Sequence, residues 1–125
     1  MATVVKVTAT GRKIVTDRIK GTGGTEPKNV AWGTGTTPPV DGDTALETAS
    51  AEAAVVGTSS VVTTTTTDDT YRVVGTLTSA SAQTITEAVL RNDAAALFIR
   101  GTFDGIALAN GDSIQFTIEG QAVAP

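Results

Sequence analysis

A turn at Gly111–Asp112 is followed by strict alternation of polar and apolar residues from Ser113 to Glu119. Successive side chains of an extended strand point to opposite faces, so this pattern predicts a strand with one apolar face. The residues on that face are Ile114, Phe116 and Ile118. Short Thr- and Val-rich runs, punctuated by Gly, Asp and Asn, repeat the pattern upstream. The chain is therefore predicted to form stacked β-sheets with little helix.

About eight short strands are predicted in all, separated by turns and loops such as 104–111. They cover 3–10, 29–33, 53–57, 61–67, 71–78, 84–90, 97–103 and 113–119. The turn Asp68–Asp69 joins two of them into a hairpin over residues 61–78. This spacing predicts an all-β, two-sheet β-sandwich, of jelly-roll type.

The spacing of apolar residues matches that of a helix only between Gly11 and Lys20. Ile14, Val15 and Ile19 fall there on one side of a helix with 3.6 residues per turn. We expect one short amphipathic helix near 14–19, lying on the sheet or on a neighbouring subunit. The 125 residues are predicted to form a single domain. Residues 1–27 hold the N-terminal strand, helix and loop, and residues 28–125 form the main sandwich.

The core is predicted from the inward positions of the later strands. Its members are Val73, Leu77, Ile85, Val89, Leu97, Ile99, Ile114, Phe116 and Ile118. The run Thr63–Thr67 is expected to coat an exposed sheet face with hydroxyl groups. The alternative is that this run contacts a partner.

Composition excludes several kinds of mechanism. The chain has no His and no Cys, so disulfide frameworks, Cys nucleophiles and Ser/His/Asp triads are impossible within one copy. A net charge of −4 opposes binding to a polyanion, so nucleic acid is not an expected partner. No apolar run approaches the roughly 20 residues of a membrane helix, and no secretion signal is recognised at the N-terminus. We expect no membrane association and synthesis in a cytoplasm.

Candidate chemistry is sparse. The Gly-rich runs 21–25 and 33–36 lack the Lys-Ser/Thr of a phosphate-binding loop. The acidic residues of 41–47 and 68–69 match no EF-hand spacing and suit turns. Glu87 lies in an apolar strand, where Arg100 or Arg72 would be its ion-pair partner. We therefore expect no catalytic residue, no metal site and no cofactor, and an enzyme of a lysis cassette is the weakest hypothesis.

Several runs, in their order along the chain, carry a resemblance to a known group of proteins. They are Gly11–Ile19, Glu26–Gly35, Asp43–Glu47, Thr84–Leu90 and Gly111–Thr117. They resemble a pattern in small structural proteins of tailed bacteriophages, which include capsid cement or decoration proteins and tail- or fibre-associated proteins. The resemblance implies a jelly-roll-like accessory protein of the virion without catalytic residues. Asn92–Ala95 departs from it, since a glycine-bearing turn is expected there.

The leading hypothesis is a capsid cement protein that joins major capsid protein subunits on the outside of a bacteriophage head. It would be made in the host bacterial cytoplasm and act as a homo-oligomer, a dimer or trimer. Expected contacts come from the N-terminal arm and helix and from the loop Gly33–Leu46. The candidate contact residues are Val5, Ile14, Ile19, Trp32, Thr34 and Leu46. The alternative is a tail- or fibre-associated sandwich that binds a host-surface glycan through an exposed aromatic platform.

Overall fold

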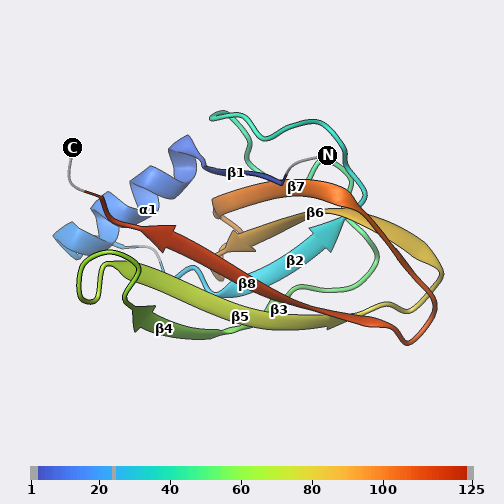
Figure 1. Ribbon diagram of the computed structural model, residues 1–125. Helices are drawn as coiled ribbons and strands as arrows, with labels where there is room; N and C mark the ends of the chain where they lie inside the picture. Colours follow the sequence, from blue (N-terminus) through green and yellow to red (C-terminus); the bar gives the residue numbers. More distant parts are fainter. Residues whose placement is uncertain (1–2, 24, 124–125) are drawn as a thin grey trace.

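The structure is a computed structural model that describes residues 3–23 and 25–123. Two antiparallel sheets face each other, and one helix packs beside them (Figure 1). The elements are β1 (Val4–Val7), α1 (Ala9–Lys20), β2 (Asn29–Gly33), β3 (Val55–Val56), β4 (Thr58–Val62), β5 (Thr70–Thr78), β6 (Gln83–Arg91), β7 (Leu97–Leu108) and β8 (Ser113–Gln121). The predicted two-sheet sandwich with one short helix is therefore confirmed.

The two sheets differ in size. The five-stranded sheet has the order β1-β7-β6-β2-β3, and the three-stranded sheet has the order β4-β5-β8. The chain passes to the larger sheet between β5 and β6 and returns between β7 and β8. This division into five and three strands does not establish the jelly roll, which is the finer part of the expectation.

The predicted hairpin is only partly correct. β4 pairs with β5 in a register that runs from Thr58 opposite Val74 to Val62 opposite Thr70. The threonines 63–67, however, form a loop and not a strand. The carboxylate of Asp69 accepts hydrogen bonds from the backbone N–H groups of residues 64, 65 and 66, at 2.8, 3.1 and 2.9 Å. A side chain thus satisfies donors that a strand ladder would otherwise need.

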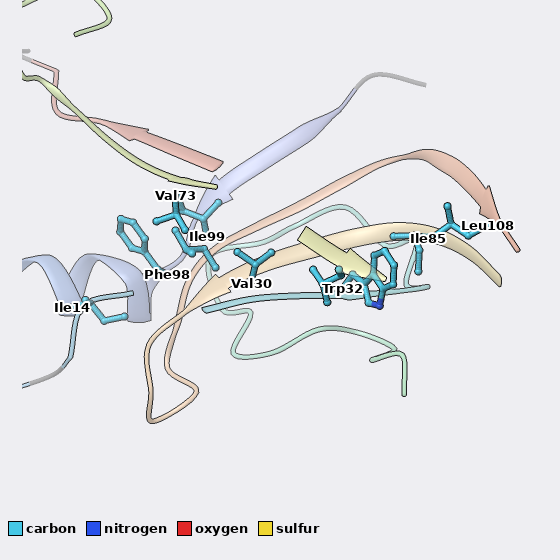
Figure 2. Packing of buried hydrophobic residues seen from close by; sticks show 10 residues of the cluster. Ile14, Val30, Trp32, Val73, Ile85, Phe98, Ile99 and Leu108 are labelled. Carbon is cyan, nitrogen blue, oxygen red and sulfur yellow. The ribbon is translucent and has the colours of Figure 1, made fainter. Parts of the chain in front are cut away.

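The main core fills the space between the sheets. Its buried members are Ile14, Val30, Trp32, Val73, Leu77, Ile85, Leu90, Phe98, Ile99 and Leu108. Figure 2 shows these side chains along the strands, from Ile14 on α1 to Leu108 at the end of β7. Trp32 meets the ring of Phe116 edge to face, with 6.3 Å between the centroids. The helix and both sheets therefore share one core.

The strand β8 contributes less to this core than was expected. Its three predicted core residues alternate as predicted, but each is only partly buried. The predicted core residues Val89 and Leu97 are buried with Ala31 in a second cluster. Because Ala31 alternates with the core residues Val30 and Trp32 along β2, this cluster lies on the opposite face of the larger sheet. The long connection before β3 covers it with Leu46 and Ala54.

The N-terminal segment also differs from prediction at its boundary. The first strand ends at Val7, and α1 begins at Ala9 instead of Gly11. Thr8 caps the helix, because its side chain accepts a hydrogen bond from the backbone N–H of Gly11 at 3.0 Å. Gly21 ends the helix in the left-handed conformation, with φ of 76°.

One later boundary was predicted wrongly, and one later turn departs from the expected glycine. β7 continues to Leu108, so most of the expected loop 104–111 is strand. The turn after β6 has no glycine, yet Ala95 adopts a positive φ of 61°. The side chain of Asn92 stabilises this turn by accepting hydrogen bonds from the backbone N–H groups of Ala94 and Ala96, at 3.0 and 2.9 Å.

Candidate functional site

A cleft lies between α1 and the ends of β5 and β8. It has a volume of about 630 Å³, within the range of sites that bind ligands or partner side chains. Its lining comes from four regions of the chain, residues 7–27, 61–71, 98 and 120–122. These residues, the helix cleft, are Val7, Ile14, Val15, Arg18, Ile19, Glu26, Pro27, Val61, Asp68, Asp69, Thr70, Tyr71, Phe98, Gly120, Gln121 and Ala122.

The position of α1 follows from its first turn. The Thr8 hydroxyl donates a hydrogen bond to the Leu97 carbonyl at 3.0 Å, which fixes the helix start to β7. Gly11 lies so close to this strand that a Cβ there would be 2.2 Å from the Phe98 carbonyl oxygen. This close approach directs Ile14 into the core, with 5% of its surface exposed, and leaves Ile19 82% exposed. One helix thus closes the core and presents apolar surface to solvent.

Polar groups form part of the cleft wall. The Tyr71 hydroxyl donates a hydrogen bond to the Glu26 carboxylate at 2.8 Å and lies 2.9 Å from the Pro27 carbonyl oxygen. Burial raises the pKa of Tyr71, and the adjacent Glu26 carboxylate raises it further. Hydrogen bonds from Ser59 and Tyr71 lower the pKa of Glu26. At neutral pH the wall therefore carries a protonated phenol beside an ionised carboxylate.

The helix lies beside the loop Gly33–Leu46, the other predicted contact region. The Ala9 N–H donates to the Asp41 carbonyl at 2.9 Å. The Arg12 guanidinium also donates two hydrogen bonds to the Asp41 carboxylate, at 3.0 and 2.6 Å. This pair raises the pKa of Arg12 and lowers the pKa of Asp41. Sequence reasoning chose the two regions separately, and the structure brings them together.

A buried carboxylate fixes this loop to the larger sheet. Glu87 has no exposed surface and accepts hydrogen bonds from the backbone N–H groups of Gly35, Glu47 and Thr48, at 2.7, 2.9 and 2.8 Å. It also accepts one from the Nε of Arg100 at 3.1 Å. Of the two partners predicted for Glu87, the structure selects Arg100. The loop is held against the larger sheet because four hydrogen-bond donors converge on the Glu87 carboxylate.

The six predicted contact residues have different positions. Ile19 is exposed at the helix cleft, and Val5 is 57% exposed on the edge strand β1. Ile14 and Trp32 are buried in the core, and the Trp32 indole N–H donates to Glu52 at 2.9 Å. Trp32 therefore presents no side-chain surface, whereas the small exposed part of Ile14 lies in the lining of the helix cleft.

The remaining two candidates lie on the loop. The side chain of Thr34 is exposed, and its backbone N–H donates to the Thr48 carbonyl at 2.9 Å. Leu46 is partly buried against the second cluster. Neither lines the helix cleft. Of the six residues, only Ile14 and Ile19 meet in that cleft.

Sequence reasoning missed Phe98, which is buried and lines the cleft. Its neighbours Leu97 and Ile99 were assigned to the core, and strict alternation would then place Phe98 on a solvated face. The available signal was the unbroken apolar run 94–99. Such a run indicates a strand covered on both faces, here by the helix and by the loop.

Potential metal ligands do not gather in the described ranges 3–23 and 25–123. No group of three or more Asp, Glu, His or Cys residues there has the arrangement of a metal site. Asp69 instead uses its carboxylate on the backbone of the Thr loop, and those hydrogen bonds hold its pKa well below the usual range. Within the same ranges, no helix is long and apolar enough to span a membrane.

The chain was compared with protein-family models, curated proteins and solved structures. None of them matches it.

Proposed function

We propose that this chain is a capsid cement protein of a tailed bacteriophage. In this proposal it binds the major capsid protein on the outer surface of the head and stabilises joints between subunits. A joint is strengthened by contact area that symmetry repeats over the whole shell, so a modest interface per copy is sufficient.

The observation that carries the proposal is the apolar exposure at the helix cleft. Ile19 is 82% exposed and Val15 is 41% exposed on the same helix, while Tyr71 and Phe98 line the hollow beside them. Apolar side chains around a concave surface favour insertion of an apolar side chain of a partner protein. The core does not need Ile19 for closure, because Ile14 already fills the position beneath the helix.

Rigidity of the surrounding surface also supports the proposal. The Arg12–Asp41 pair joins α1 to the loop, and Glu87 joins that loop to β6 and β7. A surface that is already ordered loses little conformational entropy when it binds. This property suits a protein whose task is to hold two other subunits in fixed positions.

The glycan-binding alternative requires an exposed aromatic platform. Trp32 is fully buried, and the Tyr71 hydroxyl is used within the chain. These two positions therefore favour the capsid proposal over a glycan-binding tail protein. A protein that attaches to tails without binding a glycan is a further possibility. The experiment below distinguishes it from the capsid proposal.

The experiment uses purified heads that lack this protein. Full-length chain is added, and binding is measured by cosedimentation. The temperature at which the heads release their DNA is then compared with and without the chain. We expect saturable binding and a higher release temperature. No binding to heads, together with labelled chain along the tails of whole particles, would show that the tail alternative is correct.

Two matched variants localise the interface. Ile19→Lys places a charge at the helix cleft and, near the C-terminal end of α1, is compatible with the helix dipole. Val56→Lys places the same charge at a residue of similar exposure on β3, away from the cleft lining. We expect Ile19→Lys to weaken head binding at least tenfold and Val56→Lys to leave it unchanged. Equal effects of the two variants would contradict a role for the cleft.

A further inference from the structure

Strand β8 forms a long edge of the three-stranded sheet. It pairs with β5 along all nine residues, from Ser113 opposite Thr78 to Gln121 opposite Thr70. In the part of the chain that the structure describes, no strand pairs with its other side. Alternate backbone N–H and C=O groups along β8 therefore point away from the sheet and are available to another strand.

This edge lacks the devices that usually prevent strand pairing. Natural edges are short, bulged, or marked by Lys or Pro. β8 contains no Lys, Arg or Pro, and its register with β5 has no shift. Its single charged residue, Glu119, is neutralised by Arg72 at 2.6 Å. The other edge strands of the two sheets are shorter. β3 has two residues, β4 has five, and β1 has four, one of which is Lys6.

The sandwich is also open beside this edge. A second hollow, of about 450 Å³, lies between β8 and the second half of β7. Its apolar lining includes Phe103, Ile106, Ile114 and Phe116, and the rings of Phe103 and Phe116 are 6.0 Å apart. Ile106 remains 41% exposed. A further strand at β8 would extend the smaller sheet over this opening and bury these side chains.

The sequence of β8 is complementary to itself. Consider two β8 strands from two copies, paired antiparallel with Thr117 of one copy opposite Thr117 of the other. Residues that lie directly opposite each other then project from the same face of the sheet. The other pairs are Phe116 with Ile118, Gln115 with Glu119, Ile114 with Gly120, and Ser113 with Gln121. Apolar residues thus meet apolar residues or glycine, and the charge of Glu119 meets an amide. No like charges are opposed.

We propose that β8 pairs antiparallel with β8 of a second copy, so that two three-stranded sheets become one continuous sheet in a two-fold symmetric dimer. The contact is about 30 Å long, since an antiparallel strand rises about 3.4 Å per residue. The same patch is used on both copies, so the assembly closes at two chains. Pairing of β8 with β4 of a second copy would use only five residues and would leave open ends.

Cysteine substitution tests the register directly, because the chain has no native Cys. In the dimer the two Thr117 Cα atoms would be about 4.5–5.5 Å apart, within the range that a disulfide spans. Thr117→Cys should therefore form a covalent dimer under mild oxidation. Gln115→Cys should not, since its two copies would lie about 14 Å apart along the strands. The double variant Gln115→Cys/Glu119→Cys should crosslink again.

Charge variants test the unmodified contact by equilibrium sedimentation. Wild-type chain should approach twice the 12.6 kDa chain mass as its concentration rises. Thr117→Lys should remain a monomer, because two lysines would meet at the two-fold axis. Thr76→Lys, an exposed change on the neighbouring strand β5, should still dimerise. Mixing Thr117→Lys with Thr117→Glu should restore the dimer, which a folding defect would not explain.

Three results would overturn the proposal. They are a wild-type chain that stays monomeric at high concentration, a dimer that Thr117→Lys does not dissociate, and crosslinking of Gln115→Cys as efficient as that of Thr117→Cys. All measurements use the chain alone in solution. The outcome is therefore independent of whether the chain binds bacteriophage heads.

Discussion

Glu87 and Arg100 form an ion pair between β6 and β7 that is hidden from solvent. The distance from Arg100 Nε to Glu87 Oε1 is 3.1 Å, and the two side chains are 2% and 0% exposed. Asp43 reaches the same guanidinium at 3.0 Å. The pair fixes a long connection on one face of the sheet, where the backbone of residues 35–48 would otherwise lack this anchor.

Glu87→Ala should lower the free energy of unfolding by about 3–5 kcal/mol, because it leaves three backbone donors without their acceptor and removes one of the two carboxylates that contact the buried Arg100 guanidinium. The measurement is urea unfolding at neutral pH. Glu119→Ala removes one partner of the exposed pair with Arg72 and should cost only about 0–1 kcal/mol. Similar losses for the two variants would mean that the buried pair has no special structural role.

Gly11→Ala should destabilise the protein although alanine usually favours a helix by about 1 kcal/mol over glycine. The added Cβ would lie 2.2 Å from the Phe98 carbonyl oxygen, so the helix must move away from β7. We expect a loss of about 1–3 kcal/mol in thermal or urea unfolding. Gly42→Ala is the matched control, since a Cβ there meets nothing within 4 Å. A gain in stability for Gly11→Ala would contradict the close packing.

The strands were predictable where alternation and propensity agree. β2 and the inward face of β8 match the sequence pattern. The run 63–67 misled the prediction, because five threonines have high β propensity while the Asp69 side chain competes for their backbone donors. That competition depends on a folded turn, with Asp68 at a positive φ of 59°, which the sequence pattern does not show.

The candidate site was predictable only in part for a related reason. The helical period identifies Ile14 and Ile19 as one face, but it does not say which of them closes the core. Ile14 closes the core because Gly11 and Thr8 bring the first turn of α1 against β7. The cleft also includes Tyr71 and Phe98 from distant strands. Tertiary packing alone brings these residues together.

Stability should fall in acid partly through Glu52. This carboxylate accepts hydrogen bonds from the Gln83 amide, the Ala80 N–H and the Trp32 indole N–H, and together they lower the pKa of Glu52 to about 2 from the ordinary 4.5. A depressed folded-state pKa stabilises the protein above the unfolded value. The contribution is therefore complete above about pH 4.5 and is lost as the pH falls toward 2.

Glu52→Gln isolates this contribution from those of other carboxylates. The variant should be less stable than wild type at pH 7, and the difference should narrow between pH 4.5 and 2 as the wild-type carboxylate becomes protonated. Urea unfolding over a pH series measures both curves. A difference that stays constant with pH would show that the ionised form of Glu52 is not the stabilising one.

Phe116→Ala should cost about 2 kcal/mol, less than the ~3–5 kcal/mol of a fully buried phenylalanine. Its ring contacts Trp32 and Phe103, but the side chain is only partly buried at the open edge. Urea unfolding at low protein concentration gives the value for the single chain. A loss below 1 kcal/mol would place the ring outside the core.

Ile14 and Ile19 lie on the same helix, and their roles should separate experimentally. Ile14→Ala removes a buried side chain and should lower the free energy of unfolding by about 2–5 kcal/mol. Ile19→Ala changes an exposed position and should stay within about 0.5 kcal/mol of wild type.

If the helix cleft is the contact with the capsid, the variant with the smaller effect on stability should have the larger effect on head binding. At a temperature where both variants are folded, Ile19→Ala should bind heads more weakly than Ile14→Ala. If Ile19→Ala bound as well as wild type, the contact would have to lie elsewhere, with exposed Val5 on β1 as the next position to change.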